Sequence, residues 1–284
     1  HPWGAGEVWA GTEKKGFIVE GVGRKEGYDI KMLIKKVFEE AGGLARFISK
    51  GDVVVIKPNL SWARHPDMAA TTNPRVLEGM IELCYEAGAK KVRIADHTIH
   101  DARRCFALSG AGAVAKKTDA DLIFPSSTLM KEMKINGHRL DVWPVFVPLV
   151  EADKVINLPI AKDHILCTLT LGMKNWIGAV GGRRNALHQD IHQTIVDLAQ
   201  FFKPTVTLID ATRILTRNGP SGGSLSDVVA KNTLILSNDQ VAADALASRL
   251  FGHKPGEIGF IRLAEKQGIG TSDLNQLQYK KVLL

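Results

Sequence analysis

Two histidines, His188 and His192, lie four residues apart at the end of a segment rich in glycine and basic residues. On a helix, side chains with this spacing project from one face about one turn apart, so both imidazoles can hold one metal ion. The intervening sequence, HQDIH, lacks the glutamate of a zinc-protease helix, and that chemistry is not predicted. Histidines at the edge of a buried face can equally bond to carbonyl groups, and both interpretations stay open.

A third histidine, His164, precedes this pair in the same part of the chain. Together with one carboxylate, such as Asp96 or Asp210, the three histidines would make a site for iron, zinc or another divalent transition-metal ion. Asp96 and Asp210 are also candidates for acid or base catalysis. The sequence does not show that these groups meet.

Lys174 and Asn175 stand between glycines in GMKNWIG (172–178), beside Trp176. A lysine enclosed by apolar residues must either meet an anion or lower its pKa, which makes Lys174 a candidate for binding a carboxylate or phosphate, or for acting as a base. The alternative is a surface lysine whose stem lies on the tryptophan. The basic turn GGRR (181–184) could cradle an anion through its amides and guanidinium groups, or form a basic loop.

Five apolar runs rich in Val, Ile and Leu each end in polar residues. Such runs, alternating with helical patterns, predict an α/β fold with a largely parallel sheet and helices on both faces. Ligands of such sheets bind outside the carboxyl ends of the strands, so the polar ends predict one crevice. The alternative is that some of them only cap the following helix. The polar residues are Lys57 and Asn59, Asp96 and His97, Lys162 and His164, Asp210, and Asn238 and Asp239.

The expected elements follow from hydrophobic period and turn residues. Residues 1–15 form an extended lead-in, and 16–284 form a single α/β domain or two intimately joined lobes. A small antiparallel excursion is expected near 126–150, with a turn at Asn136-Gly137. Expected strands are 16–23, 51–60, 90–97, 121–125, 154–159, 205–213 and 233–240, and expected helices are 29–49, 75–87, 101–116, 241–251 and 258–267, with a further helix carrying both His188 and His192.

Composition excludes several classes of protein. The formal charge of +7 comes from scattered basic residues, which indicates a basic surface or a pocket for an anionic ligand, and no nucleic-acid reader motif is present. The three cysteines lie far apart, so neither a disulfide framework nor an iron-sulfur cluster is predicted for this chain. No apolar run reaches the length of a membrane span, and no nucleotide-binding motif is found.

Several motifs together resemble domain-of-unknown-function family 362. They are VVIKPNL (54–60), TTNP (71–74), EAGAKKV (86–92), PIAKDH (159–164), GMKNWIG (172–178), HQDIH (188–192), IDATR (209–213), NGPSGG (218–223) and the helix start at 239–244. The resemblance implies an α/β domain, often exported through a twin-arginine signal and sometimes fused to a ferredoxin-like cluster domain. From this resemblance we expect an exported, periplasmic protein, with a cytoplasmic one as the alternative, and the lack of an initiator Met before His1 fits a removed signal as well as any other truncation.

The expected function is the binding of a metal ion or an anionic small molecule, in an enzyme or a redox-associated protein. The expected metal ligands are His164, His188 and His192. The alternatives are a non-catalytic protein that captures a cofactor or partner in the same crevice, and a set of capped strand ends around a small pocket. Oligomeric state and substrate are not predicted. The expected ligand-binding residues are Lys57, Asn59, Lys162, Lys174, Asn175 and Asp239.

Overall fold

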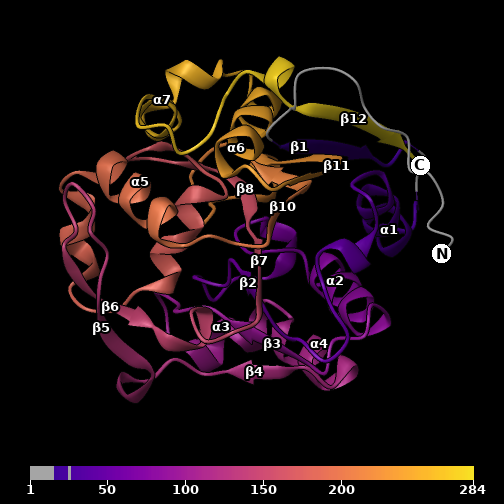
Figure 1. Ribbon diagram of the computed structural model, residues 1–284, viewed down its shortest axis with the longest axis horizontal. Helices are drawn as coiled ribbons and strands as arrows, with labels where there is room; N and C mark the ends of the chain where they lie inside the picture. The colour runs from indigo at the N-terminus through magenta and orange to yellow at the C-terminus, as the bar shows by residue number, and fades with distance from the viewer. Residues whose placement is uncertain (1–15, 25–26) are drawn as a thin grey trace, which may run out of the picture.

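A mixed sheet of ten strands forms the centre of the computed structural model (Figure 1). The structure describes residues 16–24 and 27–284, so the lead-in expected at 1–15 lies outside the described residues. Eight strands follow the order β12-β1-β11-β10-β7-β2-β3-β4, while β8 pairs with β10 and β9. The strands are β1 (Phe17–Val22), β2 (Val53–Pro58), β3 (Lys91–Ala95), β4 (Asp121–Ile123), β7 (Lys154–Leu158), β8 (Ile160–His164), β9 (Thr168–Thr170), β10 (Val206–Leu215), β11 (Val228–Ser237) and β12 (Gln278–Leu283).

The predicted α/β fold with a largely parallel sheet is confirmed. Strands β10, β7, β2, β3 and β4 run parallel to one another, as do β1 and β12. Strand β11, however, is antiparallel to both of its neighbours, β1 and β10. Its carboxyl end therefore lies beside the start of β10, where Ser237 pairs with Thr207. The polar residues after β11 thus lie at the amino ends of the neighbouring strands, on the opposite side of the sheet from the polar residues that follow the parallel strands.

Helices cover both faces of the sheet, because alternate strand residues point to opposite sides. Val54 and Ile56 of β2 pack with the first four helices, whereas Val55 packs with the last three. Figure 1 shows these two groups on different sides of the strands. The helices are α1 (Ile30–Glu40), α2 (Pro74–Glu86), α3 (Ala102–Leu108), α4 (Ala111–Thr118), α5 (Ile191–Phe201), α6 (Gln240–Ser248) and α7 (Gly259–Lys266). None of the helices in the described ranges is long and apolar enough to cross a membrane.

Local chemistry sets several of these boundaries. Asn73 caps α2 as expected, since its side chain accepts from the Arg75 amide at 3.1 Å and Pro74 occupies the first turn. The single helix expected over 101–116 is instead α3 and α4, because Gly110 takes a left-handed conformation with φ of 82°. The antiparallel excursion is confirmed as a two-stranded sheet of β5 (Met130–Lys134) and β6 (Val142–Phe146).

Candidate functional site

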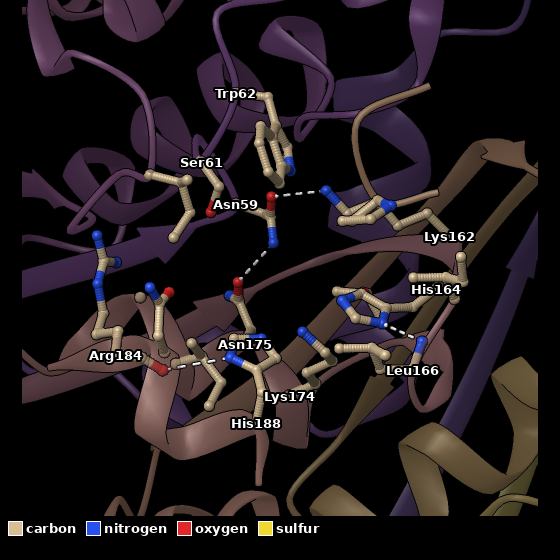
Figure 2. A pocket seen from close by; sticks show the side chains of 17 residues that line it. Asn59, Ser61, Trp62, Lys162, His164, Leu166, Lys174, Asn175, Arg184 and His188 are labelled. Atoms are coloured by element: carbon tan, nitrogen blue, oxygen red, sulfur yellow. Dashed lines mark hydrogen bonds between the residues drawn. The ribbon is translucent and has the colours of Figure 1, made fainter. Parts of the chain in front are cut away.

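A pocket of about 280 Å³ opens beyond the carboxyl ends of β2 and β8 (Figure 2). Loops after β2 and β3 supply one wall, and the β8–β9 hairpin supplies another. Two short 3₁₀ helices, Met173–Ala179 and Arg184–His188, complete it. The lining residues are Asn59, Ser61, Trp62, Ile99, Lys162, His164, Ile165, Leu166, Thr170, Lys174, Asn175, Ile177, Gly178, Arg184, Asn185, His188 and Pro220.

The pocket is lined by three cationic side chains and by no carboxylate among its described lining residues. Lys162 is buried, and its Nζ donates to Asn59 Oδ1 at 3.0 Å and to the Ala70 carbonyl at 2.5 Å. Burial, then the charge of Lys174, lowers the pKa of Lys162 well below its ordinary value. Arg184 donates to the carbonyl groups of two residues in the loop after β3, at 2.7 and 2.5 Å. The described lining therefore offers basic groups to a ligand and no carboxylate counter-ion.

Lys174 differs from the other cations because it lacks an acceptor. It is 7% exposed, and its amine makes no hydrogen bond or ion pair with any residue in the described part of the chain. Burial lowers its pKa. An ammonium group in this position would lack the compensation that a buried charge requires. The amine nitrogen is not one of the fully buried atoms, so it opens into the pocket, where a bound anion would stabilise its charged form.

The two pocket histidines present opposite hydrogen-bonding groups. His164 Nδ1 accepts from the Leu166 amide at 3.1 Å, so the proton of its neutral ring is on Nε2. Burial, with the charges of Lys174 and Lys162, lowers the pKa of His164 to about 2. His188 Nδ1 donates to the Arg184 carbonyl at 3.2 Å, which leaves its Nε2 as an acceptor. Burial and the charge of Lys174 also lower the pKa of His188.

This donor set suits an anion better than a cation. A metal ion would need the lone pair of His164 Nε2, which carries the proton, and would lie near two lysines. No group of three or more His, Cys, Asp or Glu side chains that could hold a metal occurs among the described residues. The residues present therefore do not fit the predicted divalent transition metal.

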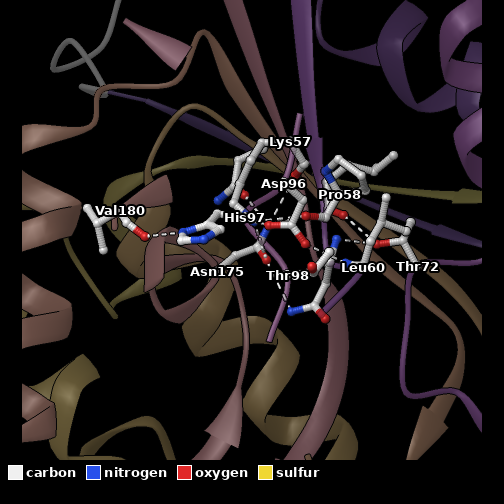
Figure 3. Close-up of polar contacts among 12 residues, drawn as sticks. Lys57, Pro58, Leu60, Thr72, Asp96, His97, Thr98, Asn175 and Val180 are labelled. Atoms are coloured by element: carbon white, nitrogen blue, oxygen red, sulfur yellow. Dashed lines mark hydrogen bonds and ion pairs between the residues drawn. The ribbon is translucent and has the colours of Figure 1, made fainter. Parts of the chain in front are cut away.

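The floor of the pocket is a buried polar network (Figure 3). Lys57 Nζ donates to Asp96 Oδ1 at 2.5 Å and to Asn175 Oδ1 at 3.1 Å. Asp96 Oδ2 accepts from the Leu60 amide at 2.6 Å, and Asn175 Nδ2 donates to Asn157 Oδ1 at 2.8 Å. Lys57 is thus neutralised from within the protein, unlike Lys174. The network joins β2, β3, β7 and the 3₁₀ helix that carries Lys174.

Further contacts with α6 and the core fix the 3₁₀ helix 173–179. Asp244 of α6 accepts from the amides of Gly172 and Met173, at 2.6 and 3.0 Å. Burial raises the pKa of Asp244 to about 7. Trp176 donates to Gln240 Oε1 at 2.6 Å and stacks on a phenylalanine ring of the core. The position of Lys174 is consequently set by a buried backbone segment, in which the next two side chains, Asn175 and Trp176, are hydrogen-bonded to the core.

Other predicted site residues lie elsewhere. The expectation that His188 and His192 share a helix is wrong, because Asp190 caps α5 between them and accepts from the Gln193 amide. His192 instead stacks on Phe260, with ring centroids 6.3 Å apart, and does not line the pocket.

Two predicted carboxylates also lie outside the pocket. Asp210 is in the middle of β10, because that strand continues to Leu215, and it accepts from the Asn73 amide and from Thr212. Asp239 caps α6 at the end of the antiparallel strand β11. The structure brings together Asn59, Lys162, His164, Lys174, Asn175 and His188 at the pocket, with Lys57 and Asp96 beneath them.

Sequence reasoning missed some residues. Thr170 lines the pocket, and its buried hydroxyl has no hydrogen-bond partner within residues 16–24 and 27–284. Trp62 and Ile99, together with Leu166, form an apolar rim that no local pattern indicates. The GGRR turn was a usable signal for Arg184.

The comparisons with known proteins give a family. A model described as "Domain of unknown function (DUF362)" matches residues 54–249. The thylakoid-associated protein sll1697 of Synechocystis sp. is 25% identical over 267 residues, covering 88% of this chain and 79% of that protein. The lactate racemase apoprotein of Thermoanaerobacterium thermosaccharolyticum matches with a TM-score of 0.48 and 14% identity, over 83% of this chain and 57% of the racemase. We infer no function from so distant a structural likeness.

Proposed function

The chain belongs to the family described as Domain of unknown function (DUF362), and we propose that its pocket binds a small organic anion bearing a carboxylate or phosphate group. The observation that carries the proposal is Lys174, a buried amine without an acceptor in a pocket that has other cations and no carboxylate among its described lining residues. An anion supplies the missing acceptor. Such a charge-assisted bond is worth roughly 1.5–3 kcal/mol.

Other lining groups support the same ligand class. Lys162 has no carboxylate partner among the described residues, since its two hydrogen-bond acceptors are a side-chain amide and a carbonyl, so a bound anion would stabilise its charged form. His164 directs an N–H group inward, and the Thr170 hydroxyl has no partner in the described part of the chain. The apolar rim favours an organic ligand over a hydrated inorganic ion, because it offers contact area and few hydrogen bonds.

The pocket contains groups for catalysis as well as for binding. His188 offers an unprotonated ring nitrogen, and Lys174 offers an amine whose pKa is lowered by burial. The same geometry would also serve a protein that only captures a cofactor. Turnover of a bound ligand distinguishes an enzyme from such a capture protein, and a redox role would additionally require an oxidised or reduced product.

The binding proposal is tested with a panel of small carboxylates and phosphate monoesters, each paired with its neutral amide or ester, in a thermal-shift assay. We expect anionic members to raise the melting temperature and their neutral partners to leave it unchanged. Lys174→Met should weaken binding by about tenfold to a hundredfold, whereas Lys116→Met, at an exposed position on α4, should not. Equal responses to anions and neutral partners would contradict the proposal.

Elemental analysis of the untagged protein provides a second test. A stoichiometric transition metal that is lost in the His188→Ala variant would show that the pocket takes a cation, and would overturn the proposal. We expect no such metal, because the donor set and nearby lysines oppose it.

A further inference from the structure

We propose that Lys174 is a nucleophile that forms an imine with an aldehyde or ketone carrying a carboxylate or phosphate group. The proposal deepens the proposed function and rests on it, since it assigns a covalent step to the same pocket. It is carried by a lysine that has no partner among the described residues and lines the same pocket as two imidazoles of opposite hydrogen-bonding character.

The amine of Lys174 is held as a nucleophile requires. A lysine reacts with a carbonyl group only as the neutral amine, and burial without an acceptor favours that form. The 3₁₀ helix beneath it is fixed by Asp244 and by the buried side chains of Asn175 and Trp176. Lys57, which lies below the floor, cannot serve in this way because it is paired with Asp96.

The surrounding cations fit the anionic end of the substrate. Lys162 lies close enough for the charge of Lys174 to lower its pKa, and Arg184 is on the same pocket wall as His188. A carboxylate held by Lys162 would keep the adjacent carbonyl group in the pocket that the Lys174 amine also lines. Burial is what lowers the pKa of the Lys174 amine and so favours its neutral form.

The two histidines suit the two ends of the carbonyl addition. His164 Nε2–H can donate to the carbonyl oxygen as negative charge develops there, without giving up its proton, because Nδ1 is already an acceptor for the Leu166 amide. His188 Nε2 can accept a proton, because Nδ1 holds the other. Figure 2 shows Lys174 extending into the pocket between these two rings.

The step balances within the pocket. The Nζ lone pair forms a bond to the carbonyl carbon as the π pair moves to oxygen, and His188 carries one proton from nitrogen to that oxygen. The nitrogen pair then forms the second C–N bond as the C–O bond breaks. His188 carries the remaining N–H proton to the departing hydroxide, so the products are a neutral imine and one water molecule, and no oxidant or reductant is needed.

Reductive trapping tests the proposal. The protein is incubated with glyoxylate and sodium cyanoborohydride, and the modified lysine is located by peptide mass spectrometry. We expect one adduct per chain at Lys174, and we expect His188→Gln to slow its formation by about a hundredfold. Lys174→Arg keeps a cation but cannot form an imine, so it should lose the adduct while remaining folded by circular dichroism.

Calorimetry with glycolate, which has a hydroxyl in place of the carbonyl group, separates the two proposals. Glycolate binding together with trapping at Lys174 supports both. Glycolate binding with glyoxylate reacting only at exposed lysines, at the rate seen in Lys174→Arg, overturns the imine step and leaves anion binding intact. If glycolate does not bind and no adduct forms at Lys174, both proposals are overturned.

Discussion

The buried ion pair beneath the pocket predicts a large and strongly non-additive effect on stability. The side chains of Lys57 and Asp96 are 1% and 0% exposed, and their charged atoms are 2.5 Å apart. Burial lowers the pKa of Lys57, whereas the Asp96 charge opposes that change. Lys57→Met would leave the Asp96 carboxylate with the Leu60 amide as its only donor among the residues that the structure describes. Breaking a buried pair from one side costs about 3–5 kcal/mol.

The double variant Lys57→Met/Asp96→Asn should cost less than Lys57→Met alone. It removes both buried charges, and the new amide oxygen can still accept from the Leu60 amide. Replacing both members of a buried pair is often close to neutral, because the desolvation penalty disappears together with the attraction. The pair carries no net charge, so its removal should also change the affinity of the pocket for anions only slightly.

The assay is urea unfolding at pH 7, monitored by circular dichroism, for the two single variants and the double variant. The exposed pair Lys117–Glu78, 2.7 Å apart, is the control, and Lys117→Met should cost no more than about 1 kcal/mol. The reasoning is refuted if the single-variant costs add within about 0.5 kcal/mol in the double variant, because additive sites are not coupled. It is equally refuted if Lys57→Met costs as little as the surface control.

Three further predictions use other parts of the structure. Gly178→Ala should cost about 1–3 kcal/mol in urea unfolding, because a Cβ there would overlap Asp96 Oδ1. The native pKa of Asp244, about 7, exceeds its ordinary value of 3.8, so its contribution to stability is full below about pH 4 and is lost as the pH rises to about 7. The measurement is the free energy of unfolding of both proteins across that pH range. Asp244→Asn should remove ~4 kcal/mol of the pH dependence, at about 1.4 kcal/mol per pKa unit. An unchanged pH dependence in the variant would contradict the prediction. His192→Phe should keep anion affinity in calorimetry and should not lower stability, because it removes a buried ring nitrogen that has no partner among the described residues.

Most of the fold follows from local patterns. The apolar runs at 53–58 and 154–158 became parallel strands, and the Asn73-Pro74 pair began α2 where a cap and a first-turn proline require. The direction of β11 did not follow, because an apolar run has the same composition whichever way its strand lies. That single reversal is why Asp239 lies away from the pocket. Export remains a prediction.

The candidate site was partly predictable. The polar pair Lys174-Asn175 between glycines marked the pocket floor, and the end of β8 marked its wall. The separation of His188 from His192 could have been read from Asp190, which precedes the apolar period of α5 and caps it. The sequence could not show that Lys174 lacks a partner among the described residues, because hydrogen-bond partners in a folded chain come from residues distant in sequence.

Three lysines of similar burial show how such partners decide chemistry. Lys57 meets Asp96, 39 residues away, and becomes half of a structural ion pair. Lys162 meets the neutral acceptors Asn59 and Ala70, which orient its amine without cancelling its charge. Lys174 meets no acceptor in the described part of the chain and lies beside imidazoles that its charge would keep neutral. Since each added cation would raise the cost of the next, the ligand that relieves this arrangement carries negative charge.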